Sequence, residues 1–144
     1  MPPVIVADTG AILALLDKGD RHHVVLGSLY AKDPAQWILP WAILPEVDYL
    51  AASQLGPRAA AAFLADLADG LFQVEWGSEA DLSRAKEICR RHRALRVGLV
   101  DAVVVAIAER RRAEAIATLD LRHFGVMAIK GGPRLLPRDS TGAG

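Results

Sequence analysis

The sequence predicts a single α/β domain in which a largely parallel central sheet of about five short strands is flanked by helices. Short apolar runs alternate along the chain with longer segments of helical periodicity, as in folds where each strand is followed by a helix. The chain has 144 residues, of which 52% are hydrophobic and 24% charged, so it is long and apolar enough to bury one core.

The expected elements fall into two alternating sets. Strands are predicted at residues 3–7, 37–39, 71–76, 115–119 and 126–129. Helices are predicted at residues 11–16, 21–32, 41–55, 58–68, 78–91 and 99–110.

The first strand is the clearest, because residues 3–7 are apolar apart from an initial proline and end at Asp8. Such a run is typical of a strand that is covered on both faces. Asp20 can cap the second helix, which the pair Asp33-Pro34 ends. Pro45 marks a position where a helix can begin, since a first-turn proline loses no hydrogen bond.

Similar punctuation defines the later elements. Gly56-Pro57 separates two helical segments, and Gly70 ends the second of them. Ser78, with Asp81 three residues later, is the pattern of a helix capping box. Residues 115–119 again read as a strand, and Asp120 follows them.

The helix at 99–110 organises the prediction, because it is apolar around most of its circumference and therefore belongs inside the protein. Gly98 breaks the chain before it, and Arg110 lies at its C-terminal end, where a cation is favourable. Asp101 is the exception in its first turn. It is either a charge placed well against the helix dipole or a member of a site.

Composition limits the domain organisation and the function. Residues 1–130 are expected to form the domain, and residues 131–144, with two prolines and four glycines, a flexible C-terminal tail. The formal net charge is zero, so any basic surface for nucleic acid must be local. No apolar run reaches 18 residues and no signal sequence begins the chain, so we expect a soluble cytoplasmic protein with no membrane partner.

Several kinds of site are disfavoured. The single cysteine, Cys89, excludes a disulfide within the chain and a thiolate zinc cluster, and the four histidines lack zinc spacing. The aromatic residues Trp37, Trp41, Phe72 and Trp76 all fit core positions, so no exposed platform for stacking bases is predicted.

Four acids are expected at equivalent places: Asp8, Glu46, Asp101 and Asp120 each follow a strand or open a helix. Each alone has an ordinary explanation as a cap, turn or first-turn charge. Together they are candidates for one site, because the carboxyl ends of parallel strands meet at one edge of a sheet. Clustered carboxylates repel one another unless a cation lies among them, and oxygen ligands suit Mg²⁺ or Mn²⁺. Thr9 and Thr118 are placed to orient these carboxylates by hydrogen bonds.

The segments around these acids resemble the four acidic motifs of the PIN-domain nucleases, and the order of elements resembles the VapC-type toxins of bacterial toxin–antitoxin pairs. The likeness covers residues 3 to 130. The motifs are Val6-Ala7-Asp8-Thr9-Gly10-Ala11-Ile12-Leu13, Leu44-Pro45-Glu46-Val47, Leu99-Val100-Asp101-Ala102 and Thr118-Leu119-Asp120-Leu121-Arg122-His123-Phe124.

The resemblance implies an Mg²⁺-dependent endoribonuclease, with Mn²⁺ as a possible substitute, that acts as a toxin. By the same resemblance Asp8, Glu46, Asp101 and Asp120 would be both the metal ligands and the catalytic residues. The implied partners are an RNA substrate, a cognate antitoxin in an apolar groove at the helices flanking the second strand, and a second copy in a homodimer. His123 stands where many relatives carry a further acid, which leaves the number of bound ions open.

The arginines near the central helix are candidates for the local phosphate grip. Arg93 and Arg96 precede Asp101 and are interpreted as contacts to RNA phosphates. The run Arg110-Arg111-Arg112 is as well explained as a solvated helix end. His123 is interpreted first as a surface-loop residue, and otherwise as a proton-transfer group near the acids.

Other classes of protein remain as alternatives. A receiver-like signalling domain also has an acid after its first strand, and Lys130 would match its lysine, but the third strand here ends Glu75-Trp76-Gly77 without a phosphoacceptor aspartate. A haloacid-dehalogenase-like phosphatase would need an aspartate at the position of Gly10. A catalytically silent interaction module on the PIN fold is disfavoured by the intact acid set and stays open.

Overall fold

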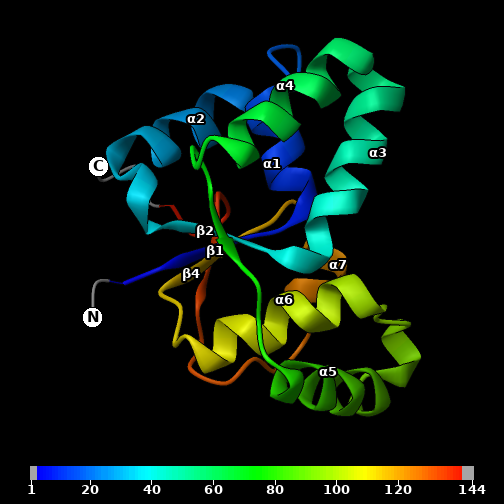
Figure 1. Cartoon of the computed structure of the whole chain (residues 1–144). Helices are drawn as coiled ribbons and strands as arrows, with labels where there is room; N and C mark the ends of the chain where they lie inside the picture. The colour runs from blue at the N-terminus through cyan, green and yellow to red at the C-terminus, as the bar shows by residue number, and fades with distance from the viewer. Residues whose placement is uncertain (1–2, 141–144) are drawn as a thin grey trace.

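Five short strands pair in parallel in the order β3-β2-β1-β4-β5. The computed structural model describes residues 3–140 (Figure 1). The strands are β1 (Ile5–Ala7), β2 (Trp37–Pro40), β3 (Gln73–Glu75), β4 (Ala115–Ala117) and β5 (Arg134–Leu136). The predicted parallel α/β class is therefore confirmed.

Helices cover both faces of this sheet. In Figure 1, α1 to α4 lie on one face, and α5 and α6 lie on the other. The helices are α1 (Thr9–Leu16), α2 (His23–Lys32), α3 (Leu44–Leu55), α4 (Pro57–Ala68), α5 (Glu79–Arg91), α6 (Leu99–Arg110) and α7 (Leu121–Phe124). Short 3-10 turns occupy Pro34–Gln36, Trp41–Ile43 and Arg93–Leu95. No helix within residues 3–140 is long and apolar enough to cross a membrane.

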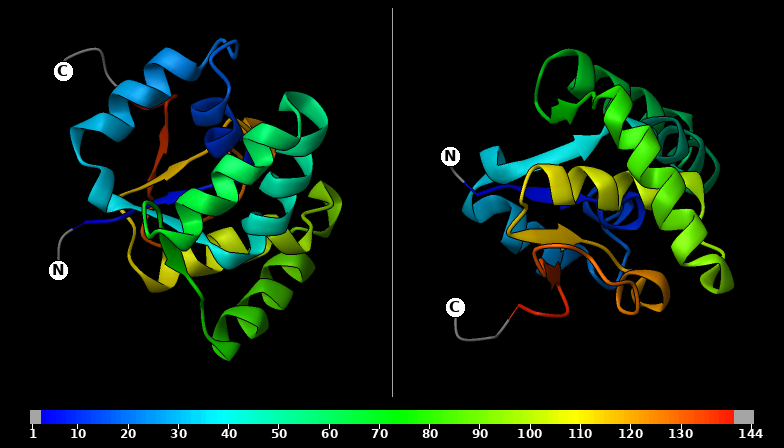
Figure 2. Two further views of the ribbon diagram at one scale, coloured as in Figure 1. Left: turned by 45° about the horizontal axis from the view of Figure 1, so that its top comes forward. Right: turned by 90° about the horizontal axis from the view of Figure 1, so that it is seen from below.

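The central helix α6 is buried as its sequence predicts. Its residues 102–108 are all buried, and the helix packs against β1, β2 and α5 (Figure 2). Leu99 is 57% exposed, because the first turn of α6 emerges from the core at the carboxyl edge of the sheet. Asp101 lies in this emerging turn.

The predicted position of the fifth strand is wrong. Residues 126–129 form no strand, because the backbone N–H groups of Val126 and Met127 donate to the His123 carbonyl in the turn after α7. The strand beside β4 is β5 instead, within the segment expected to be a flexible tail, and Leu135 and Leu136 are buried there. Residues 141–144 of that segment lie outside the described part of the chain.

The aromatic residues divide between core and surface. Trp37 is buried in β2 as predicted. Trp76 is 73% exposed, which contradicts its predicted core position. It follows β3, the edge strand of the sheet, where no further strand covers its side chain.

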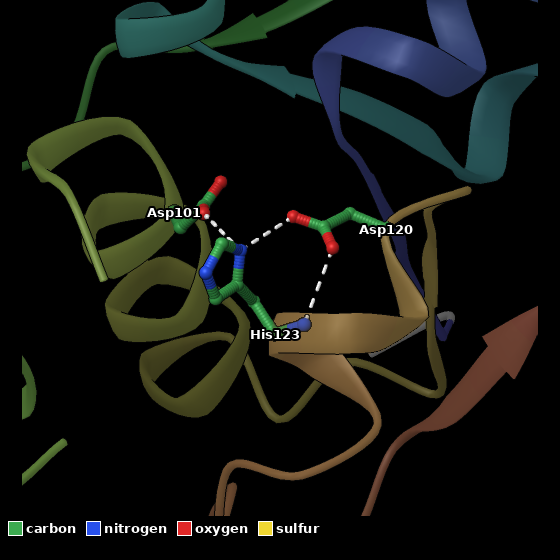
Figure 3. Close-up of side chains that lie close together, drawn as sticks. All are labelled: Asp101, Asp120 and His123. Atoms are coloured by element: carbon green, nitrogen blue, oxygen red, sulfur yellow. Dashed lines mark hydrogen bonds and ion pairs between the residues drawn. The ribbon is translucent and has the colours of Figure 1, made fainter. Parts of the chain in front are cut away.

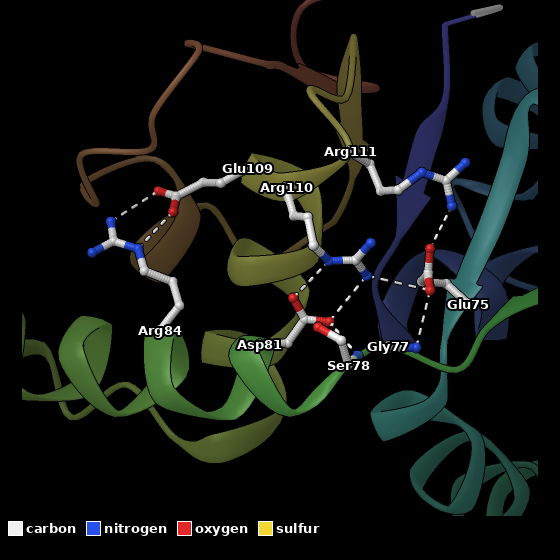
Figure 4. A network of polar contacts seen from close by, with 8 residues as sticks. All are labelled: Glu75, Gly77, Ser78, Asp81, Arg84, Glu109, Arg110 and Arg111. Carbon is white, nitrogen blue, oxygen red and sulfur yellow. Dashed lines mark hydrogen bonds and ion pairs between the residues drawn. The ribbon is translucent and has the colours of Figure 1, made fainter.

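A network of ion pairs joins the end of β3 to α5 and α6, on residues shown in Figure 4. Asp81 accepts two hydrogen bonds from Arg110, at 2.8 and 3.0 Å, and completes the predicted capping box with Ser78. Glu75 contacts Arg110 and Arg111. Arg110 and Arg111 are therefore paired with buried or half-buried acids, so they are not free to bind phosphate.

We expect Asp81→Ala to lower the free energy of unfolding by about 2 kcal/mol, since it strips Arg110 and the Ser78 N–H of a buried acceptor. Urea denaturation measures this loss. The matched control is Glu87→Ala, which breaks the fully exposed Arg90 pair and should leave the unfolding midpoint unchanged. Equal effects of the two variants would contradict a structural role for the network.

Candidate active site

All four predicted acids line one pocket of about 340 Å³ at the carboxyl edge of the sheet. Asp8 directly follows β1, Glu46 and Asp101 lie in the first turns of α3 and α6, and Asp120 caps α7. The starts of α3 and α6 and the short α7 meet at the right-hand end of the sheet in Figure 1. Parallel strand pairing thus brings together acids that are 38, 55 and 19 positions apart in sequence.

Thr118 connects two of these acids. Its hydroxyl donates a hydrogen bond of 3.0 Å to Asp8 and accepts one of 3.0 Å from the Asp120 backbone N–H. Thr118 is 1% exposed, and Asp8 is 6% exposed. The Asp8 backbone N–H also donates to the Ala117 carbonyl at 2.8 Å. These bonds fix Asp8 against β4.

Thr9 does not make the hydrogen bond to a carboxylate that we expected. Its hydroxyl oxygen is buried and has no hydrogen-bond partner in the described part of the chain. The side-chain hydrogen bond to Asp8 comes from Thr118 instead. Thr9 still lines the pocket.

Burial and neighbouring negative charges make the ionised forms of Asp8 and Asp101 less favourable. Burial, followed by the negative charges of Asp101 and Asp120, raises the pKa of Asp8 to about 7 from its ordinary 3.8. Burial raises the pKa of Asp101 as well, with Asp120 and Glu46 adding to the rise and His123 opposing it. An added cation at this edge would lower both pKa values.

His123 lies among the acids, a position that the sequence analysis held only as its second alternative. Figure 3 shows its ring between Asp101 and Asp120. The Nδ1 atom is 2.7 Å from Asp120 Oδ2 and 3.5 Å from Asp101 Oδ2, and Nε2 is 2.9 Å from the Leu95 carbonyl. The signal in the sequence was the spacing of three from Asp120, which puts both side chains on one side of a helical turn.

The surroundings of His123 favour its protonated form. Both ring nitrogens face oxygen atoms that can only accept, unless a carboxyl is protonated, and a neutral imidazole has one N–H. The hydrogen bond to Asp120, chiefly, raises the pKa of His123, with smaller contributions from the Leu95 carbonyl and the Asp101 charge. Among the described residues, His123 is thus the one basic side chain in direct contact with the pocket acids.

The two arginines interpreted as phosphate contacts lie between α5 and α6, close in sequence to Asp101. Arg93 and Arg96 are exposed, and neither has an ion-pair partner within residues 3–140. Arg96 adopts the left-handed conformation, with φ of 53°.

The donor set fits a divalent cation of the Mg²⁺ or Mn²⁺ type. The pocket offers carboxylate oxygens from four side chains, and carboxylate oxygens of Asp101 and Asp120 lie within 4.8 Å of one another. The raised pKa of Asp8 shows that its charged form is unfavourable in this pocket, and a bound cation would stabilise that form.

A family model of the PIN domain matches residues 5–130. The chain belongs to the PIN-domain family. The family predicted from the four acidic motifs is thereby confirmed, and the match covers every one of those motifs.

Individual relatives of this PIN domain agree. The chain is 31% identical over 130 residues to Ribonuclease VapC26 of Mycobacterium tuberculosis, covering 90% of this chain and 96% of that protein. The crystal structure of M. tuberculosis VapC20, a Sarcin-Ricin loop cleaving toxin, matches with a TM-score of 0.75 at 24% identity, over 86% of this chain and 96% of that one. DNA-bound VapBC from Salmonella typhimurium matches with a TM-score of 0.70 at 18% identity, over 93% and 97%. The two structures show the same fold.

We expect the metal-free PIN domain to lose stability as pH rises from about 4 to about 7, because native Asp8 keeps its proton while the unfolded carboxyl has lost it. At about 1.4 kcal/mol per pH unit, the loss due to Asp8 is of the order of 4 kcal/mol. Asp8→Asn should flatten this slope and raise the stability at pH 8.

Urea titrations in EDTA at several pH values measure the effect. Asp69→Asn, which removes an exposed acid at the end of α4, serves as the control and should keep the wild-type slope. Asp101 and His123, whose pKa values are also raised, leave a smaller slope in Asp8→Asn. A slope as steep as that of the wild type would contradict the assignment of the effect to Asp8.

Proposed function

We propose that this chain is an Mg²⁺-dependent endoribonuclease that acts as the toxin of a toxin–antitoxin pair. The observation that carries the proposal is the set of four carboxylates around one pocket, with Asp8 buried beside the charges of Asp101 and Asp120. An arrangement so unfavourable without a cation supports a site for metal-assisted chemistry. The ribonuclease name of the VapC26 relative supports RNA as the substrate.

The chain's own residues have distinct tasks in this proposal. The ion would be held by the four acids Asp8, Glu46, Asp101 and Asp120. Thr118 fixes Asp8 relative to the Asp120 backbone through its two hydrogen bonds. When bound there, a divalent cation would supply Lewis-acid chemistry, namely activation of a water and neutralisation of negative charge on the phosphodiester. His123 contacts Asp120 and Asp101 through Nδ1 and so helps to orient their carboxylates.

We expect the purified chain, freed of any antitoxin, to cut a pool of structured RNAs into discrete products with Mg²⁺ and not with EDTA. Asp101→Asn should reduce the cleavage rate more than about 100-fold. Even mutation of residues that only hydrogen-bond to metal ligands commonly lowers activity about 10- to 100-fold. The rates are measured on labelled RNA by gel electrophoresis.

The same variant supplies a stability control. Asp101→Asn should keep or raise the melting temperature in EDTA, because it removes one of the repelling charges. Millimolar Mg²⁺ or Mn²⁺ should raise the melting temperature of the wild type by binding the native state, and should do so less in the variant. An unfolded variant would assign Asp101 a structural role, and an unchanged wild-type melting curve would argue against a shared metal site.

An apolar groove supports the second part of the proposal, an antitoxin partner. The groove, of about 470 Å³, is lined by α3, α4 and the end of β3 rather than by α2. Leu64 and Trp76, exposed by 62% and 73%, form part of its wall. The neighbour from S. typhimurium is a VapBC complex, which supports an apolar segment of an antitoxin as the occupant. The homodimer implied by the family resemblance stays a prediction.

We expect Leu64→Asp to weaken binding of the cognate antitoxin at least about tenfold, since it places a charge in an apolar contact. Calorimetry with purified antitoxin measures the change. Leu82→Asp, on the exposed face of α5 and outside the groove, should bind like the wild type. Full affinity of Leu64→Asp would place the antitoxin elsewhere.

A further inference from the structure

The segment between α5 and α6, residues 92–98, contacts His123, which in turn contacts two acids of the pocket. A 3-10 turn at Arg93–Leu95 opens it, and left-handed Arg96 then reverses the chain into α6. Val97 anchors it in the core with 8% exposure. We call this segment the arginine loop, after Arg93 and Arg96.

His123 ties the arginine loop to the acids. Through Nε2 it donates to the Leu95 carbonyl at 2.9 Å, and through Nδ1 it contacts Asp120 at 2.7 Å and Asp101 at 3.5 Å. One ring thus spans two elements that are 28 residues apart in sequence. The bond to Leu95 needs only a hydrogen on Nε2.

The cations of the arginine loop differ from most other arginines of the molecule. Six arginines elsewhere are held by acids: Arg84, Arg90, Arg110, Arg111, Arg134 and Arg138. Arg93 and Arg96 are exposed and have no such partner in the part of the chain described. Two exposed cations without an acid partner, on a loop that His123 joins to two of the pocket acids, are available to a phosphate group.

We propose that His123 is a positioning residue for the substrate: it holds the arginine loop so that Arg93 and Arg96 grip the RNA backbone next to the acids. The inference rests on the proposed nuclease function and adds to it a residue and a surface. A loop held in one conformation loses less entropy when it binds RNA, so the tie favours binding of the substrate. It also keeps the bound phosphodiester near Asp101, which follows the loop in the first turn of α6.

Two substitutions of His123 can each keep one of its two contacts, either the one to Leu95 or the one to Asp120, and so show which contact matters. The amide nitrogen of Gln can replace Nε2 as donor to Leu95, whereas Asn is shorter and can replace only Nδ1 toward Asp120. We expect hydrogen exchange in peptides spanning the arginine loop to speed up in His123→Ala and His123→Asn, and to stay near the wild-type rate in His123→Gln. This measurement is made on the full chain without metal or RNA.

The kinetic expectation follows the same order. His123→Ala and His123→Asn should raise KM for RNA about tenfold, the equivalent of one hydrogen bond to a charged group, with a smaller change in kcat. His123→Gln should restore KM. Arg96→Ala should raise KM alone, and adding it to His123→Ala should give less than the product of the two effects. Arg58→Ala removes an exposed cation at the start of α4 and should leave KM unchanged.

Other outcomes overturn the inference. If the loop exchanges at the wild-type rate in His123→Ala while calorimetry shows weaker binding of Mn²⁺, His123 serves the acids alone. If Asn restores KM and Gln does not, the contact to Asp120 carries the effect. A wild-type chain that neither binds nor cuts RNA overturns the proposed function, and with it the task assigned to the arginines, even where the exchange pattern is as expected.

Discussion

The pairing of β1 with β2 on one side and β4 on the other is the constraint on which the rest of the molecule depends. All three strands run in the same direction, so the residues that follow them arrive at one edge. The Asp8 N–H extends the β1–β4 pairing by a further bond to Ala117. The buried face of α6 packs across β1 and β2, and this packing delivers Asp101 to the same edge. The pocket is a consequence of sheet topology and of one apolar helix.

The acids of this protein fall into two electrostatic classes. Outside the pocket, Glu75, Asp81 and Glu109 are each held by an arginine, and the pKa values of Glu75 and Glu109 are lowered. Inside the pocket, Asp8 has no ion-pair partner within residues 3–140, and burial beside like charges raises its pKa. A fold that neutralises its structural acids with arginine and leaves the clustered ones largely without cations has stability to gain from a metal ion.

The sequence predicts those parts of the fold that depend on local pattern. The apolar runs locate β1, β2 and β4, and the continuous apolar surface of α6 predicts its burial. The edges are less predictable, because a short edge strand is selected by its partner and not by its own composition. Residues 126–129 are apolar yet form a turn, and Arg134–Leu136, between two prolines, pairs with β4. The prediction of Trp76 as a core residue was wrong because this residue follows an edge strand, and no further strand covers it.

At the site, the sequence predicts the meeting of the acids but not the position of His123. That the acids meet follows from topology, but the position of His123 depends on the turn of α7, which carries no long periodic signal. The importance of His123 lies in the basic group that it places among the acids. A phosphodiester that approaches Asp8, Asp101 and Asp120 meets several negative groups, so it can lie beside them only where cations offset the repulsion. The net charge of zero leaves this to local groups, which in the proposed function are a metal ion, His123 and the exposed arginines of the arginine loop. In the proposed function, metal and arginine loop act on the same repulsion, so weakening either increases the dependence of RNA binding on the other.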